Sequence, residues 1–325
     1  MDFQIKIVLL AFALSIFLSC ICIPVLKRLK VGQIERDDGP QSHLSKQGTP
    51  TMGGIIMILC MLLAGGFLYW DYSQTEPEMA KSLLPLLFVS VGFGIVGFID
   101  DFKKLVMKNT KGLKPAYKMF GLLIIAVAFT IYLCYASNVG TQTYIPFIKT
   151  YIEMPIWLYI PFAICVMLAT TNAINLTDGV DGLSTSVTTI ILTCLTVIGI
   201  MFGIKEISIF GGILIGTCLG FLLFNLHPAK VMMGDTGSLL LGGAIAGMAL
   251  YLKMPLLLII IALIPVIETI SVILQVGYFK RTGNRIFKMA PIHHHFELSG
   301  WNENKIVSIF SVVTLILCVI GLASI

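Results

Sequence analysis

The stretch IVLLAFALSIFLSCICIPVL, Ile7 to Leu26, contains no charged residue. A transmembrane helix needs about 20 consecutive apolar residues, and this run is long enough to cross a bilayer. A signal peptide has a shorter apolar core followed by a small-residue cleavage site, whereas Lys27, Arg28 and Lys30 follow here. We therefore expect a membrane-spanning helix that is not removed.

The composition of the whole chain agrees with this expectation. Of the 325 residues, 57% are hydrophobic and only 12% are charged, with a mean hydropathy of +0.94, whereas about 25% of the residues of a soluble domain are charged. The eight cysteines fall inside apolar runs without the spacing of a metal site, so we interpret them as small buried residues. A net charge of +5 can arise from lysine and arginine retained on one side of a membrane, and we expect no nucleic-acid partner.

Ten apolar segments are long enough to cross the membrane. They are predicted at residues 3–24, 52–70, 82–99, 119–136, 156–174, 186–203, 207–224, 237–253, 255–277 and 304–324. With these spans, 17 of the 22 lysine and arginine residues fall in the odd-numbered connections. The positive-inside rule then places those connections in the cytoplasm and both termini outside.

The sequence thus predicts an all-α polytopic membrane protein that forms a single catalytic domain over residues 1–325. Its active-site face would consist of the cytoplasmic loops 25–51, 100–118, 175–185, 225–236 and 278–303. The external stretch TQTYIPFIKTYIEMPI, residues 141–156, alternates in polarity and predicts a small β-hairpin between the fourth and fifth helices.

Aspartates gather in three of the predicted cytoplasmic loops. GFIDDFKK, Gly97 to Lys104, places Asp100 and Asp101 at the inner end of an apolar helix, where a carboxylate needs water, a cation or a partner. An ordinary helix end in water is the alternative, and it accounts less well for a pair of aspartates than for one.

NAINLTDGVDGL, Asn172 to Leu183, contains two Asp-Gly steps between apolar spans. Glycine permits a tight turn and a close backbone approach to a ligand, and the aspartates and asparagines offer oxygen ligands or hydrogen bonds. Because a hairpin turn would need only one such step, we favour a binding role for this loop.

FNLHPAKVMMGDTGSLLLGG, Phe224 to Gly243, carries a further aspartate, Asp235, directly before an apolar span. One interpretation of Asp235 is an N-cap for that helix. The other is a site for a Mg²⁺-bound diphosphate, because carboxylates from three loops and nearby lysines would supply hard oxygen ligands and positive charge. Zinc is disfavoured, because no cysteine lies outside the apolar runs.

Two further features lie toward the C-terminus. Glu268 follows Pro265 inside the ninth predicted span, where an ionisable residue indicates either function or interhelical hydrogen bonding, and where proline can break the helix. The triplet His293, His294 and His295 can hardly bind one metal from a regular helix, since neighbouring side chains point about 100° apart. We interpret the triplet as one wall of a substrate cleft that donates hydrogen bonds to phosphate or sugar oxygens.

Several of these stretches together resemble a known family. FIDDFKK (98–104), NAINLTDGVDGL (172–183), NLHPAKVMMGDTGSLLLGG (225–243) and MAPIHHHFE (289–297) are similar, in order and spacing, to the motifs of the phospho-N-acetylmuramoyl-pentapeptide transferases, within the polyprenyl-phosphate N-acetylhexosamine-1-phosphate transferase superfamily. The resemblance covers essentially the whole chain, including GTPTMGG at 48–54. Its most specific part is QVGYFKRTGNRIFKMAPIHHHFE, 275–297, where sister enzymes for other UDP-sugars diverge.

The resemblance implies an enzyme that transfers phospho-MurNAc-pentapeptide from its UDP carrier to undecaprenyl phosphate, giving lipid I and UMP. This reaction belongs to peptidoglycan synthesis at the bacterial cytoplasmic membrane, and so to cell-wall biogenesis, cell shape and cell division. The family is Mg²⁺-dependent and is described as a ten-span homodimer with a broken ninth helix and a cleft at the cytoplasmic face.

Matched motif by motif, the resemblance also implies roles for individual residues. Asp235 would bind Mg²⁺, with Asp100 and Asp101 beside the metal and the phosphates. Lys118 would hold the nucleotide or its phosphates. The residues implied in substrate binding are Asn172, Asn175, Asp178, Gly179, Val180, Asp181, Asn225, Met232, Gln275, His293, His294 and His295. Met232 departs from the family, in which a Phe often stacks on the uracil, so a thioether contact would replace stacking at this position.

Two alternative functions and a choice of mechanism stay open. A sister transferase would keep the chemistry and use another UDP-N-acetylhexosamine. An ion-coupled transporter would need charged residues in several spans, whereas only Glu268 lies clearly inside one. In the transfer itself, a carboxylate such as Asp100 deprotonates the lipid phosphate for direct attack, which we favour, or an aspartate attacks first and forms a phospho-enzyme.

Overall fold

Helices make up almost the whole of the structure, a computed structural model that describes residues 2–29, 48–105, 112–137 and 139–325. Parts of the predicted loops 25–51 and 100–118 lie outside these ranges. The helices are α1 (Asp2–Arg28), α2 (Gly54–Thr75), α3 (Pro77–Leu105), α4 (Pro115–Tyr135), α5 (Ile156–Thr177), α6 (Leu183–Met201), α7 (Lys205–Asn225), α8 (Gly234–Tyr251), the 3₁₀ turn η2 (Pro255–Leu257), α9 (Leu258–Ile261), α10 (Leu263–Thr282), α11 (Ile292–Glu297) and α12 (Glu303–Ala323).

Nine of the helices within the described ranges are long and apolar enough to cross a membrane. They are α1 to α7, α10 and α12. Their outer faces expose large apolar side chains, such as Trp157, which is 73% exposed, and Phe17, which is 62% exposed. Exposed apolar surface on this scale is stable in contact with lipid, so the chain is a multi-pass membrane protein.

The helix at the eighth predicted span, α8, is not among these nine. It begins with the polar run Gly234 to Ser238, and every residue from Thr236 to Tyr251 is buried by other parts of the protein. α8 is therefore the central helix of the bundle, and its surroundings are protein on all sides.

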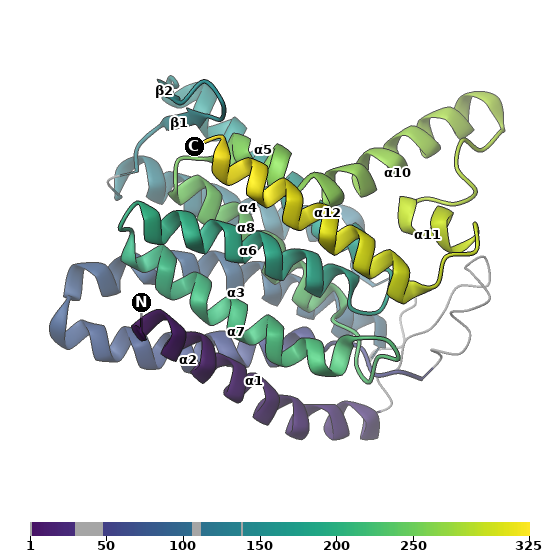
Figure 1. The fold of residues 1–325 in the computed structure, drawn as a ribbon, viewed down its shortest axis with the longest axis horizontal. Helices are drawn as coiled ribbons and strands as arrows, with labels where there is room; N and C mark the ends of the chain where they lie inside the picture. The colour runs from purple at the N-terminus through teal and green to yellow at the C-terminus, as the bar shows by residue number, and fades with distance from the viewer. Residues whose placement is uncertain (1, 30–47, 106–111, 138) are drawn as a thin grey trace.

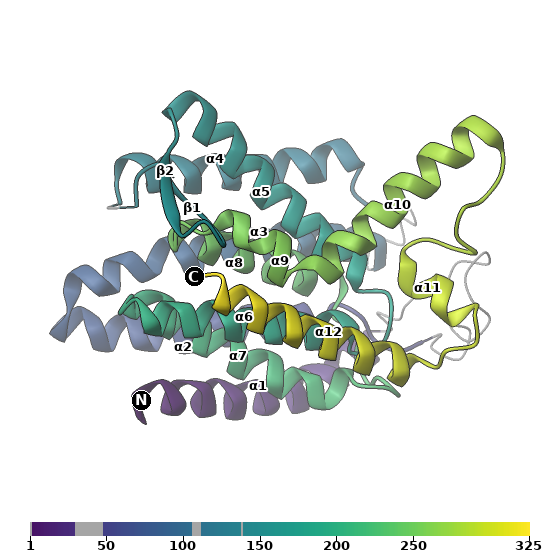
Figure 2. The same cartoon turned by 45° about the horizontal axis from the view of Figure 1, so that its top comes forward.

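The ninth predicted span is broken, as expected. The chain leaves helical geometry at Ala262, which ends α9 and precedes α10. Pro265 lies three residues later, in the first turn of α10, where its missing N–H would have no acceptor within the helix. Beyond the break, α10 projects away from the bundle and α11 lies beneath its far end (Figures 1 and 2).

A two-stranded antiparallel hairpin lies between α4 and α5, where the alternating stretch predicts one. It consists of β1 (Gln142–Ile145) and β2 (Thr150–Glu153), with Thr143 opposite Ile152. The hairpin and both chain termini lie toward one end of the bundle, and α11 lies toward the other (Figures 1 and 2). The bundle thus separates its hairpin end from the end that carries the histidine triplet.

Close backbone contacts fix the start of α8 against its neighbours. A Cβ at Gly97 of α3 would lie 2.2 Å from the carbonyl oxygen of Asp235, so only glycine allows the two helices to approach this closely. The segment before α2 pairs with the segment before α8, because Met232 donates to Pro50 at 2.8 Å and Gly53 donates to Met232 at 2.9 Å. These contacts place Asp235 beside the C-terminal end of α3, which carries two further aspartates.

Candidate active site

Two carboxylates and two ammonium groups meet where α3, α4 and α8 converge. Lys104 Nζ lies 2.7 Å from Oδ2 of Asp100 and 2.8 Å from Oδ2 of Asp235. Lys118 Nζ lies 2.9 Å from Oδ2 of Asp235 and 3.7 Å from Oδ2 of Asp100. We call these four residues the acidic centre; the structure brings three predicted site residues together with Lys104.

The second oxygen of each carboxylate is also engaged. Asn175 of α5 donates to Oδ1 of Asp235 at 2.7 Å and to the hydroxyl of Ser238 at 2.8 Å. The backbone N–H of Leu113 donates to Oδ1 of Asp100 at 2.7 Å. Neighbouring groups therefore hold both carboxylates in fixed orientations.

Asp101 turns away from the lysines and holds the start of α8. Its carboxylate accepts from the backbone N–H of Thr236 at 2.9 Å, from the Thr236 hydroxyl at 2.6 Å and from the backbone N–H of Asp235 at 3.3 Å. The N-cap interpretation of Asp235 is wrong, because Met233 is the N-cap and Asp235 lies in the first turn. The free N–H groups of this helix are satisfied by Asp101 of a neighbouring helix instead.

Asp178 ends α5 beside the acidic centre. Burial, together with the negative charges of Asp235 and Asp101, raises the pKa of the Asp178 carboxyl to about 8. A hydrogen bond from the backbone of Gly234 acts in the opposite direction. Proximity to the other carboxylates makes this residue sensitive to any cation that binds among them.

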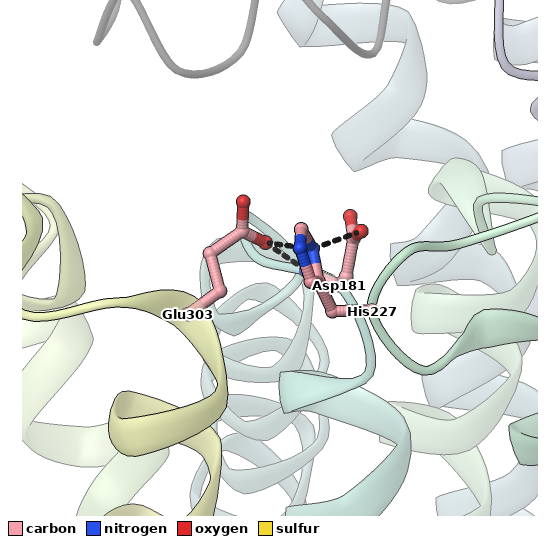
Figure 3. A group of neighbouring side chains, drawn as sticks. All are labelled: Asp181, His227 and Glu303. Carbon is pink, nitrogen blue, oxygen red and sulfur yellow. Dashed lines mark hydrogen bonds and ion pairs between the residues drawn. The ribbon is translucent and has the colours of Figure 1, made fainter.

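Asp181 forms a second cluster with two residues from distant parts of the chain (Figure 3). His227 Nδ1 lies 3.1 Å from Oδ2 of Asp181 and 3.7 Å from Oε2 of Glu303. The backbone N–H of Asp181 donates to the same Glu303 oxygen at 3.2 Å, and Ala229 donates to Asp181 at 3.0 Å. The cluster joins the loop after α5, the loop after α7 and the first turn of α12, and its ligand atoms lie within 4.8 Å of one another.

Several residues expected at the nucleotide are buried in the structure. The amide of Asn225 accepts from Thr185 at 2.7 Å and donates to the carbonyl of Val231 at 3.0 Å. Met232 is 5% exposed and is held by the backbone contacts with Pro50 and Gly53. Asn225 thus shapes the loop from 226 to 233 from inside, and Met232 lies beneath its surface. Val180 is likewise fully buried.

The histidine triplet forms half of the short helix α11. His293 is fully buried, with Nδ1 3.1 Å from Oε2 of Glu268. His294 Nδ1 lies 2.6 Å from Oε2 of Glu297, and Nδ1 of His295 accepts from the backbone of Lys288 at 3.1 Å. The Nδ1 atom of each ring contacts a different partner, so these three atoms do not converge on one metal position.

Two further predicted residues, Gln275 and Asn172, make local contacts. Gln275 accepts from the backbone N–H groups of Ile286 and Phe287 and donates to the carbonyl of Phe287 at 3.1 Å, which ties the chain after α10 back onto that helix. Asn172 donates to the carbonyl of Leu168 at 2.7 Å, within its own helix α5.

Lys104, His227 and Glu303 were not predicted as site residues. The spacing of Lys104 four residues after Asp100 is a signal for a salt bridge on one helix face, and it could have identified this residue. Glu303 follows an asparagine that caps α12, and its pairing with Asp181 across 122 positions has no signal in the local sequence.

The acidic centre suits a divalent cation. Oxygens of Asp100 and Asp235 both lie within 2.8 Å of one ammonium nitrogen, so both can reach a single cation at that position. Carboxylate oxygens are the ligands that hard divalent cations prefer. The third aspartate, Asp101, is committed to α8 and would stay beside such a cation without touching it.

Comparisons with known proteins identify the family of the chain. The family described as glycosyl transferase family 4 matches residues 83–253, which include most of α3 and all four residues of the acidic centre. A protein of Acetivibrio thermocellus named phospho-N-acetylmuramoyl-pentapeptide-transferase is 47% identical over 98% of this chain and 94% of its own length. Proteins of the same name from Clostridium botulinum strain Alaska E43 and Caldicellulosiruptor bescii are 49% and 43% identical, over 96% and 98% of this chain and 94% and 96% of their own lengths. The predicted resemblance is confirmed, and the chain belongs to the phospho-N-acetylmuramoyl-pentapeptide transferases of glycosyl transferase family 4.

Proposed function

We propose that the protein transfers phospho-MurNAc-pentapeptide from UDP-MurNAc-pentapeptide to undecaprenyl phosphate, giving lipid I and UMP, with the whole chain 1–325 as one catalytic unit. The observation that carries this proposal is the acidic centre, where Asp100, Asp235 and two lysines meet within a bundle of membrane-spanning helices. Phosphoryl transfer between a water-soluble nucleotide and a membrane lipid needs such a site in such a bundle.

The charges of the acidic centre match a diphosphate and its counter-ion. Mg²⁺ bound to Asp235, with Asp100 beside it, would neutralise the diphosphate and stabilise the departing UMP. Lys104 and Lys118 each hold a carboxylate in the structure, and their ammonium groups can turn to the phosphates when the donor binds. Asn175 keeps the carboxylate of Asp235 oriented during this exchange.

The loop that follows α5 is the proposed nucleoside site, with Asp178, Gly179, Val180 and Asp181 as its residues. Asp181 is fixed by Ala229 and by the ring of His227, so its carboxylate keeps one orientation. Asn225 and Met232 support the neighbouring loop from beneath. Uridine would therefore lie against a rigid surface rather than induce one.

An apolar groove beside the broken helix is the proposed place of the polyprenyl chain. A cavity of about 220 Å³ lies between α5 and the α9–α10 segment, lined by apolar residues that include Ala169, Ala173 and Pro265. Ala173 lies two residues from Asn175, which contacts the acidic centre. A lipid in this groove would thus direct its phosphate along α5 toward Asp100 and Asp235, past Asn172.

The lipid phosphate is proposed to attack the diphosphate directly, with Asp100 accepting its proton. A phosphate monoester near neutral pH is already largely dianionic and needs little activation. In the competing route an aspartate attacks first and forms an acyl-phosphate. Radiolabelled acyl-phosphate trapped after mixing the protein with the UDP-substrate alone would overturn direct attack.

The charge distribution supports an orientation in which the acidic centre faces the cytoplasm of a bacterial cell, at the inner membrane. Lysine and arginine are concentrated in the odd-numbered connections, and the positive-inside rule assigns these to the cytoplasm. The histidine triplet and Gln275 would then line the cytoplasmic mouth of the cleft. A homodimer is proposed from the family resemblance.

An assay of UMP release tests the function. Purified protein is mixed with undecaprenyl phosphate, Mg²⁺ and either UDP-MurNAc-pentapeptide or UDP-N-acetylglucosamine. We expect UMP with the first donor alone. Release with the second donor only would indicate a sister transferase, and release with neither would reject both enzymes.

A further inference from the structure

A buried polar pair outside the acidic centre joins α10 to α11. Glu268 and His293 are both 0% exposed. His293 Nδ1 lies 3.1 Å from Oε2 of Glu268, and the backbone N–H of His293 donates to the same oxygen at 3.4 Å. One carboxylate oxygen therefore contacts both the ring and the backbone at the start of α11.

The far edge of the His293 ring rests on the loop after α5. A Cβ at Gly179 would lie 2.2 Å from Nε2 and 2.7 Å from Cε1 of His293, closer than Cβ atoms approach other atoms. Because the ring is fully buried and is held by Glu268, it has no space to move aside. Position 179 therefore needs glycine for a reason other than backbone conformation.

Packing alone does not account for this choice of residues. Glu268 Oε1 and both ring nitrogens of His293 are buried and have no hydrogen-bond partner in the part of the chain that the structure describes, and Nδ1 makes only its 3.1 Å contact with Glu268. A buried polar atom without a partner destabilises a fold, and apolar side chains of similar volume would avoid that loss. A buried polar pair with unpaired atoms is consistent with a role in which the position of the two side chains matters more than their contribution to stability.

The position of this pair connects the projecting arm to the bundle. α10 and α11 extend beside the helical core (Figures 1 and 2), and the contact between His293 and Gly179 bridges the two. The ring of His294 lies next to that of His293, with centroids 4.1 Å apart. A displacement of His293 would therefore move both the rest of the triplet and the proposed nucleoside loop.

We propose that Glu268 is a positioning residue for the transfer reaction, which holds His293 against Gly179 and so sets α11 and the Asp178–Asp181 loop at the spacing that the UDP donor requires. This inference rests on the proposed function and extends it to a residue that does not touch the substrates.

A double-mutant cycle on Gly179 and His293 tests the proposal. Gly277→Ala is the control, because a Cβ at Gly277 of α10 meets nothing within 4 Å. Gly179→Ala should lower kcat/KM for UDP-MurNAc-pentapeptide about 100-fold, through a higher donor KM, because the added methyl group displaces the ring and misplaces the donor. The KM for undecaprenyl phosphate should not change. In the double variant Gly179→Ala, His293→Ala the overlap is gone, so its kcat/KM should lie within about twofold of that of His293→Ala alone.

Additive losses in the double variant, or a Gly179→Ala protein with unchanged donor KM, would overturn the proposal. If Gly179→Ala does not fold, Glu268→Ala and Glu268→Gln are measured instead. The donor KM should rise in Glu268→Ala, and it should rise less in Glu268→Gln, because glutamine keeps an oxygen acceptor. Equal donor KM values for Glu268→Ala and wild type would overturn the proposal. Wild-type UMP release is measured first. If it is absent, the proposed function fails, and the same cycle in melting temperature still decides whether the contact exists.

Discussion

Nζ of Lys118 lies 2.9 Å from Oδ2 of Asp235, although 117 positions separate the two residues in the chain. The fold brings the first turn of α4 onto the first turn of α8, so a cation and an anion meet before any substrate is present. In the proposed reaction both charges would acquire new partners: Lys118 would turn to phosphate oxygens, and Asp235 would hold the metal ion. The ion pair therefore keeps two reactive groups in place between turnovers.

Replacement of Lys118 tests this role. Lys118→Met should lower kcat/KM by about 100-fold or more, because one of two ammonium groups that stabilise the developing phosphate charge is lost. Lys118→Arg keeps the charge and should retain more activity, although its planar group cannot occupy the same position. UMP release measures both variants, and a Lys118→Met enzyme within twofold of wild type would show that Lys104 alone suffices.

The hydrogen bonds of Asp101 predict a stability effect. Asp101→Ala removes the acceptor for the N–H groups at the start of α8 and for the Thr236 hydroxyl, all in a buried site. We expect a loss of about 2 kcal/mol in the free energy of unfolding, seen as a lower melting temperature in detergent. The exposed Asp71 of α2 provides the matched control, and Asp71→Ala should melt like wild type. Equal melting temperatures for the Asp101 and Asp71 variants would contradict the capping role.

Asp178 predicts a pH effect on stability. Its pKa is raised in the folded protein to about 8, well above the ordinary value of an aspartate, about 4, so the folded state binds an extra proton between these pH values. Stability from this group is therefore lost as the pH rises from about 4 to about 8. With divalent cations chelated, Asp178→Asn should melt at a higher temperature than wild type at pH 8, and the difference should shrink toward pH 4. A difference that is independent of pH would argue against a buried, protonated Asp178.

Gly97 predicts a steric effect on the acidic centre. Gly97→Ala would place a Cβ 2.2 Å from the carbonyl oxygen of Asp235 and force α8 away from α3. Because Asp235 and Asp100 belong to these two helices, activity should fall by about 100-fold. Gly66→Ala of α2 is the control, since a Cβ there meets nothing within 4 Å. Comparable UMP release by the two variants would show that the spacing of α3 and α8 is not critical.

Most of the helices could be predicted from the sequence, because long apolar runs are a local property. The break in the ninth span was also predictable, because the span contains a proline. The break itself lies at Ala262, and Pro265 lies in the first turn of α10, where a helix accepts proline. The complete burial of α8 could not be predicted from the sequence, because composition shows that a helix is apolar but does not show what surrounds it.

The aspartates of the candidate site were predictable from the sequence, and their contacts were not. Aspartates in three loops indicated an anionic site, and Asp100 and Asp235 do meet there. Asp101, next in sequence to Asp100, contacts the start of α8 instead. Neighbouring helical residues face different directions, so tertiary packing decides which of two adjacent aspartates faces the lysines.

Asp235 is the residue on which the account depends most, because it joins the two lysines, Asn175 and the proposed metal. The most direct test is the rate of UMP release from UDP-MurNAc-pentapeptide and undecaprenyl phosphate over a range of Mg²⁺ concentrations, for wild type and for a folded Asp235→Asn variant. The wild-type rate should rise with Mg²⁺ and saturate, while the variant should show no turnover at any Mg²⁺ concentration. An Asp235→Asn protein that retains Mg²⁺-dependent UMP release would contradict the assignment of the acidic centre as the catalytic site.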